Sequence, residues 1–241
     1  ACGGNNSSSS STSTEAGTAK TKYASEVTHE GTPIKGGTLK YAIVSSSPFS
    51  GIFADELSQV TTDSTIGGLI DESMFEYDEN RKLTNTGLAS IEFDVENKTA
   101  TVTLNSKEYK WSDGQPVTID DYIFAYQAIG NKDYTGVRYD GDFKNVVGME
   151  EYHNGKADSV SGLEKVDDYT VKIHFKEMSP SMQLAGGSVS AYIMPKHIFK
   201  DIPEAEWEQS DYVRGKKFVG LGQFKIDSIV AGESVTLVPN E

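Results

Sequence analysis

The chain has little cysteine, few basic residues and no long apolar run. Its single cysteine, Cys2, excludes an internal disulfide bond. No apolar run reaches the length of about 18 residues that indicates a transmembrane helix. Lys and Arg together number 22 against 36 Asp and Glu, a formal net charge of −14 over 241 residues. Because nucleic-acid phosphates bind clustered cations, this balance argues against nucleic acid as a partner.

The common signatures of catalysis and metal binding are missing as well. The sequence contains no Gly-x-Ser-x-Gly, no phosphate-binding loop and no His-Glu-x-x-His. Two acidic pairs, Asp120-Asp121 and Asp167-Asp168, are explained by helix capping and by a turn. The histidines lack metal-ligand spacing, and strand alternation points His174 outward; the four are His29, His153, His174 and His197. We predict no enzymatic activity, no metal site and no cofactor.

The most informative stretch is a predicted turn and helix at residues 111–126. Asp113 and Gly114 supply turn chemistry, since Asp can bond its own backbone and Gly accepts a positive φ. Thr118 is a good N-cap, and Asp121 three residues later completes a capping pair. The helix is predicted to end at Gly130. The helix carries one apolar stripe at positions i, i+3, i+4 and i+7, namely Ile119, Tyr122, Ile123 and Tyr126.

Elsewhere the patterns predict a mixed α/β fold in which strands outnumber helices. The alternation of apolar residues predicts β-hairpins at 91–104 and 163–175, where turn residues separate the two runs. It also predicts a first strand at 38–44 and a last strand pair at 224–226 and 235–237. The other expected segments are a glycine-loosened helix at 57–74, a turn at 77–80, a long irregular segment at 131–160 and a short helix at 203–209 that carries Trp207.

The first 35 residues have the composition of a flexible tether. They are rich in Ser, Thr, Gly, Ala, Glu and Lys and contain few large apolar side chains, so burial cannot offset their ordering entropy. Ala1-Cys2-Gly3-Gly4 looks like the end of a bacterial lipobox, whose cysteine receives lipid after the signal peptide is removed. The alternatives are a free thiol at Cys2 and a disordered expression remnant.

Several strings resemble family 5 of the extracellular solute-binding proteins, the oligopeptide-binding lipoproteins of ABC importers. The strongest is Trp-Ser-Asp-Gly-x-Pro-Val-Thr-x-x-Asp, which begins at Trp111. The resemblance extends from Gly36 to Glu241. The further matching strings are 37–42, 146–148, 152–157, 166–171, 194–197 and 219–224; in the last, Leu221 and Gln223 replace the Thr and Pro of the family pattern.

This resemblance implies an α/β fold of the periplasmic-binding-protein type II (cluster C), here its first lobe, with a mixed sheet and an inserted subdomain. On the family layout, 36–78 and 187–241 form the hinge-side domain and 79–186 form the inserted subdomain. Residues 1–35 precede them as the tether. The second lobe, which completes the cleft in such proteins, is not expected within these 241 residues.

The resemblance also implies an extended oligopeptide ligand, an ABC permease as partner, and lipid anchoring through Cys2 at the extracellular face of the membrane of a Gram-positive bacterium. It implies that the Trp-Ser-Asp string supports the fold without touching ligand. Ligand contacts are expected at Gln59, Val60, Thr61 and Thr62, with Tyr139 as an apolar wall that ends in a hydroxyl. A dipeptide, a metal chelate or an oligosaccharide stays open as ligand. The rival function is a surface-displayed adhesin or peptide-pheromone receptor on the same scaffold.

Overall fold

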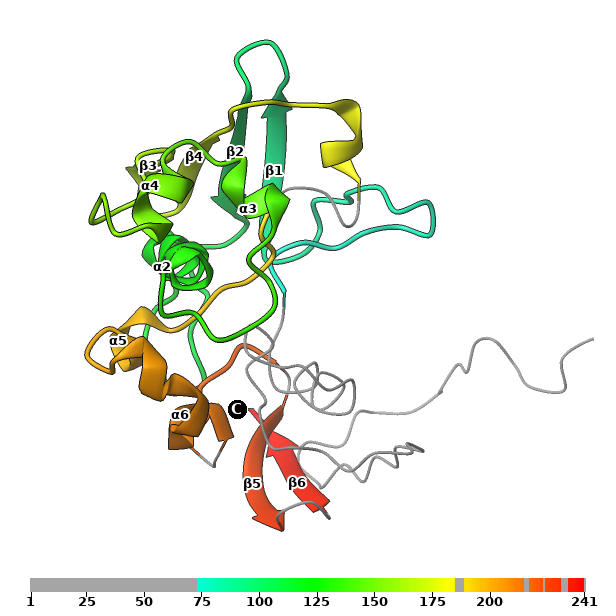
Figure 1. Cartoon of the computed structure of the whole chain (residues 1–241). Coiled ribbons are helices and arrows are strands. Elements are labelled where there is room, and N and C mark those ends of the chain that lie inside the picture. Colours follow the sequence, from blue (N-terminus) through cyan, green and yellow to red (C-terminus); the bar gives the residue numbers. More distant parts are fainter. Residues whose placement is uncertain (1–72, 185–188, 215–216, 223, 231–233, 241) are drawn as a thin grey trace, which may run out of the picture. The chain divides into compact units, whose positions relative to one another are not determined.

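The computed structural model describes residues 73–184, 189–214, 217–222, 224–230 and 234–240 (Figure 1). Cys2, the predicted first strand at 38–44 and the proposed ligand residues at 59–62 lie outside the described residues. So does the predicted helix at 57–74, apart from its last two positions.

A four-stranded antiparallel sheet organises the larger part of the described chain. Its strand order is β1-β2-β4-β3, so the two predicted hairpins lie side by side, joined through β2 and β4. Val102 is paired with Ile91 on one side and with Val171 on the other, and all three side chains are buried. Both hairpin predictions are confirmed. The strands are β1 (Ala89–Asp94), β2 (Thr99–Leu104), β3 (Leu163–Asp167) and β4 (Thr170–His174).

Helix α2 (Ile119–Gly130) is buried on two faces rather than along one stripe. Its predicted stripe contributes to a core cluster that includes the sheet, although Ile123 stays half-buried. Ala125 and Ala128, on another face, are buried in a second cluster. Small side chains there let the next layer of the protein approach the helix closely. The helix therefore lies between two hydrophobic cores, which its single-stripe pattern did not predict.

The second core cluster joins α2 to the C-terminal part of the chain. Its other buried members are Met194, Phe199, Trp207, Val213, Phe218, Ile226 and Leu237. The last two come from β5 (Phe224–Val230) and β6 (Ser234–Pro239), which pair antiparallel. The predicted final strand pair is thus confirmed and is longer than expected.

Short helices fill the connections. The segment 131–160, predicted to be irregular throughout, contains α3 (Gly141–Lys144) and α4 (Met149–His153), so that prediction was wrong in part. Asp140 caps α3 by accepting hydrogen bonds from two backbone N–H groups, a signal hidden among the turn residues of this segment. The other short helices are η1 (Pro180–Gln183), α5 (Lys196–Phe199), η2 (Glu204–Gln209) and α6 (Asp211–Arg214). None of the described helices has the length and apolar character that crossing a bilayer requires.

Gly130 ends α2, as predicted, but it does so without forming a left-handed cap. The following residue, Asn131, has an extended conformation with φ of −68°, so no left-handed cap is formed. A Cβ atom on Gly130 would collide with the sulfur of Met149, a fully buried side chain. The glycine is needed for close packing of α4 against the end of α2.

Candidate functional site

The Trp111 string forms a tight turn just before α2. The Trp111 N–H donates to the carbonyl of Gln115, and the Gly114 N–H donates back to the carbonyl of Trp111, each at 2.8 Å. Gly114 has a φ of +86°, and the carboxylate of Asp113 accepts the Gln115 N–H at 3.1 Å. The turn chemistry predicted for Asp113 and Gly114 is confirmed.

The carboxylate of Asp121 connects this turn to α2 and to the first residue of α5. It accepts hydrogen bonds from the indole N–H of Trp111 at 3.1 Å, from the Thr118 N–H at 3.0 Å and from the Lys196 N–H at 3.0 Å. The bond to Thr118 is the carboxylate half of the predicted capping pair. Only 5% of Asp121 and 2% of Trp111 are exposed, so these bonds lie inside the core.

Burial raises the pKa of Asp121 above the ordinary carboxyl value. The hydrogen bonds from Thr118, Trp111 and Lys196 act in the opposite direction, because each stabilises the charged carboxylate. A nearby histidine, His197, lowers the pKa further. The buried carboxyl group is therefore held in place by three hydrogen-bond donors.

Two further contacts bring distant strings of the sequence to the same turn. The carboxylate of Asp113 lies 2.6 Å from Nε2 of His197. The Ser112 N–H donates to the carbonyl of Gly220 at 3.0 Å, and the Gly220 N–H donates to the Ser112 hydroxyl at 3.1 Å. The segments around residues 111, 195 and 220 are thus held together by these contacts. The Trp-Ser-Asp string therefore has a structural role.

Tyr139 was predicted as a ligand-contacting wall. The structure places it half-buried against the first core cluster, with its ring stacked on His153 at a centroid distance of 4.0 Å and an angle of 13°. The ring centroids of Tyr139 and Phe143 are 6.4 Å apart, and the Lys144 ammonium lies 5.7 Å from the centroid of the Tyr139 ring. Partial burial raises the pKa of the Tyr139 hydroxyl. The other predicted ligand residues, Gln59, Val60, Thr61 and Thr62, lie outside the described part.

Two further histidines of the described chain, His153 and His174, have structural partners. His174 lies 2.7 Å from the Glu164 carboxylate across the β3–β4 pair, and its side chain is 40% exposed, as predicted from strand alternation. Nδ1 of His153 lies 2.9 Å from the carbonyl of Gly130. Within the described ranges, no group of three or more His, Cys, Asp or Glu side chains is placed to hold a metal ion.

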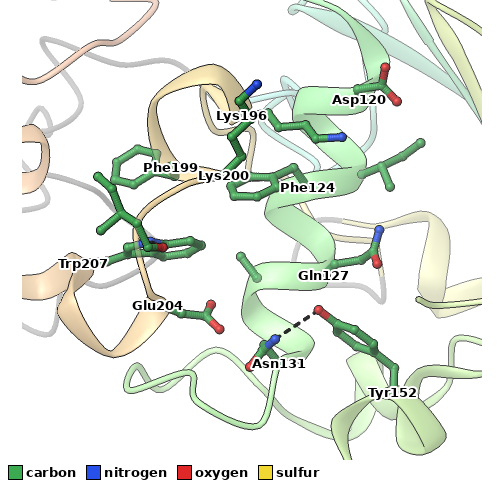
Figure 2. A pocket seen from close by; sticks show the side chains of 13 residues that line it. Asp120, Phe124, Gln127, Asn131, Tyr152, Lys196, Phe199, Lys200, Glu204 and Trp207 are labelled. Carbon is green, nitrogen blue, oxygen red and sulfur yellow. Dashed lines mark hydrogen bonds between the residues drawn. The ribbon is translucent and has the colours of Figure 1, made fainter. Parts of the chain in front are cut away.

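A cavity of about 320 Å³ lies between α2, α4, α5 and η2 (Figure 2). Phe124 and Phe199 flank the indole of Trp207, with ring centroids 5.7 Å and 5.2 Å from it. The indole N–H donates to the carbonyl of Ile202 at 2.8 Å, which fixes the ring. Sequence reasoning missed this cavity. The sequence did contain a pattern that could have predicted it. A second face of α2 and its C-cap carries residues at helical spacing, namely Phe124, Ala128 and Asn131.

Glu204 is the unusual group in this cavity. Its Oε1 is buried and has no hydrogen-bond partner among the described residues. Burial, with a smaller effect from the charge of Asp133, raises the pKa of Glu204 to about 8. Nearby, the Asn131 side chain donates to the Tyr152 hydroxyl at 3.1 Å (Figure 2).

Three comparisons with known proteins point to one family. The sequence profile of bacterial extracellular solute-binding proteins, family 5 (middle part), matches residues 85–241. The oligopeptide-binding protein OppA of Lactococcus lactis subsp. lactis is 38% identical over 202 residues, which cover 81% of this chain and 33% of that protein. The chain therefore belongs to the family 5 bacterial extracellular solute-binding proteins. It spans about a third of the length of the curated relatives it matches.

Solved structures agree with this assignment. Lactococcal OppA, complexed with an endogenous peptide in the closed conformation, is similar with a TM-score of 0.76 and 36% identity, covering 81% of this chain and 37% of that one. The pheromone receptor PrgZ has the same fold, with a TM-score of 0.65 at 20% identity over 82% of this chain and 38% of its own. The predicted α/β fold of the periplasmic-binding-protein type is confirmed.

Proposed function

We propose that this chain forms the first lobe of the extracellular peptide-binding subunit of an ABC-type oligopeptide importer. The observation that carries the proposal is the likeness to lactococcal OppA in its peptide-bound, closed form, with 36% identity over four-fifths of this chain. A peptide lies extended between this lobe and a second one and pairs its backbone with strand-like segments. Closure of the lobes about a hinge then presents the loaded subunit to the permease. No bond of the ligand is made or broken, so the subunit is not an enzyme.

The domain layout is part of this proposal. Residues 79–186 form the inserted subdomain, and 36–78 with 187–241 form the hinge-side domain. The four-stranded sheet supports this division, since all of its strands fall within 89–174, whereas β5 and β6 contribute to the second core cluster. Residues 1–35 serve as a tether, with lipid on Cys2 holding the subunit at the outer face of a Gram-positive cell membrane. A Cys2→Ser variant should leave the membrane fraction and appear in the medium.

The ligand contacts of this lobe are proposed at Gln59, Val60, Thr61 and Thr62, with Tyr139 beside them. Backbone pairing predicts that Thr61→Pro, which removes an N–H, weakens peptide binding about tenfold. Thr61→Val keeps the N–H and a similar shape, so it is the matched control and should bind peptide as the unchanged protein does. Equal affinities of the two variants would place the ligand contacts elsewhere.

Native mass spectrometry of the protein purified from its own cells tests the function. A ladder of masses that correspond to bound peptides supports the proposal, and the ladder gives the ligand lengths. The rival function, an adhesin or a pheromone receptor, predicts no ladder or one defined peptide. Growth on peptides as the sole source of an essential amino acid separates the two, because only loss of an importer subunit abolishes it.

A further inference from the structure

The cavity beside Trp207 has two ends of opposite charge. Figure 2 shows Lys196, Lys200 and Asp120 at one end and Glu204, with Asn131 and Tyr152, at the other. Asp120 is already paired with Lys165 at 2.8 Å. Within the described residues, the ammonium groups of Lys196 and Lys200 have no ion-pair partner. This end of the cavity is therefore suited to an anion.

Apolar side chains line the middle of the cavity. Phe124 and the buried rings of Trp207 and Phe199 form one wall, and Ile123 and Ala128 of α2 contribute apolar surface beside it. The volume of about 320 Å³ lies at the lower limit of the range for small-ligand pockets, which is about 300–1,000 Å³. Such a space accepts a single small ring or a short aliphatic body.

At the Glu204 end, no donor among the described residues bonds to the buried Oε1 of Glu204. A buried carboxyl oxygen without a partner costs free energy, and native proteins rarely leave one unpaired. Two groups act at this end of the cavity: Asp133, whose negative charge attracts a cation, and the Tyr152 hydroxyl, which accepts a hydrogen bond from Asn131. A ligand that brings an ammonium group would pair with the Glu204 carboxyl, which lines the cavity, and offset the acidic charge of Asp133.

We propose that this cavity, which none of the residues proposed to contact peptide lines, is a second binding site for a small zwitterion whose ammonium and carboxylate are separated by an apolar body. The ammonium binds Glu204, the body packs against Phe124 and Trp207, and the carboxylate binds Lys196 and Lys200. An α-amino acid fits poorly, because its two charges are adjacent and cannot reach both ends.

A rigid probe of this chemistry is 4-(aminomethyl)benzoate, titrated calorimetrically into the 241-residue chain. Benzylamine lacks the carboxylate and 4-methylbenzoate lacks the amine, and each is expected to bind at least about tenfold more weakly. This series needs no variant, so it is independent of any folding defect. Equal binding of the probe and 4-methylbenzoate would overturn the proposal.

Variants then locate the binding. Glu204→Gln should weaken the probe about tenfold or more, whereas Glu206→Gln, an exposed neighbour on η2, should leave it unchanged. Lys200→Gln should also weaken it, with the exposed Lys156→Gln as control. Probe binding that survives Glu204→Gln in a folded variant would overturn the proposal.

Proton release gives a further readout. At pH 7 the Glu204 carboxyl, with its pKa of about 8, is mostly protonated, and an ammonium beside it lowers that pKa. Binding of the probe should therefore release a proton, seen as a heat that depends on the ionisation enthalpy of the buffer. Asp120, Lys196, Lys200 and Tyr152 also line the cavity, and the charge of Asp133 acts on Glu204. If the proton comes from Glu204 and not from these groups, the release should disappear in Glu204→Gln. Binding without proton release would mean that the ammonium does not reach Glu204.

Discussion

The indole N–H of Trp111 donates a 3.1 Å hydrogen bond to the carboxylate of Asp121, ten residues further along the chain and inside the core. The same carboxylate accepts the Lys196 N–H at 3.0 Å. One side chain of α2 thus fixes both the preceding turn and the start of α5. Through these hydrogen bonds the Trp-Ser-Asp string stabilises the fold.

Asp121 and its neighbour Asp120 should differ sharply in their effect on stability. Asp121→Asn replaces one acceptor oxygen by an NH₂ group that faces donors, so we expect a loss of about 2–3 kcal/mol in the free energy of unfolding. Asp120→Asn removes only a partly exposed pair with Lys165, which should cost less than about 1 kcal/mol. Urea denaturation of both variants measures the difference. Equal losses would mean that the buried bonds contribute little.

Gly114 and Gly141 form a matched pair for testing backbone strain. A Cβ atom meets no neighbour within 4 Å at either position, but only Gly114 has a positive φ, of +86°. Gly114→Ala should therefore cost about 1–2 kcal/mol, whereas Gly141→Ala should be neutral or stabilise by up to about 1 kcal/mol. Thermal unfolding of the two variants gives the comparison. A neutral Gly114→Ala would show that the turn relaxes without cost.

Gly130 and Met149 should be energetically coupled, because a Cβ atom on Gly130 collides with the Met149 sulfur. Overpacking should make Gly130→Ala cost about 1–2 kcal/mol, despite the better helix propensity of Ala. Met149→Ala should cost about 2–4 kcal/mol through the cavity it leaves. The double variant should lose at least about 0.5 kcal/mol less than the sum of the two. Additive losses in a double-mutant cycle would contradict the contact.

Glu204 should make the stability of the protein depend on pH. Between the pKa of an unfolded Glu, about 4.3, and the folded pKa of about 8, the folded state holds a proton that the unfolded state has released. The free energy of unfolding therefore falls as pH rises through this window and levels off above it. Because Glu204→Gln cannot titrate, it should match the unchanged protein at or below about pH 4 and exceed it near pH 9.

The control for this prediction is Glu206→Gln, which should follow the unchanged protein at every pH. Asp133→Asn should reduce the fall, since the charge of Asp133 contributes to the raised pKa of Glu204. Denaturant midpoints at several pH values test all four proteins together. Parallel curves for Glu204→Gln and the unchanged protein would show that Glu204 does not hold its proton.

Local patterns determined much of this fold. The hairpins at 91–104 and 163–175 followed from alternating apolar residues and the turns between them, and α2 followed from its capping pair and apolar stripe. These signals are contained within about 15 residues, so no tertiary contact is needed to interpret them. The short helices α3 and α4 were missed because each is a single turn whose capping residues are also turn residues.

Only the tertiary structure determined which distant segments of the chain contact one another. Asp121 meets Lys196 across 75 positions, Asp113 meets His197 across 84, and Ser112 meets Gly220 across 108. No periodicity in the sequence encodes those distances, since they depend on how two cores close around α2. The buried oxygen of Glu204 is a second case: an acidic residue in a short helix is ordinary in sequence, and only packing against α2 and Asp133 gives it a pKa of about 8.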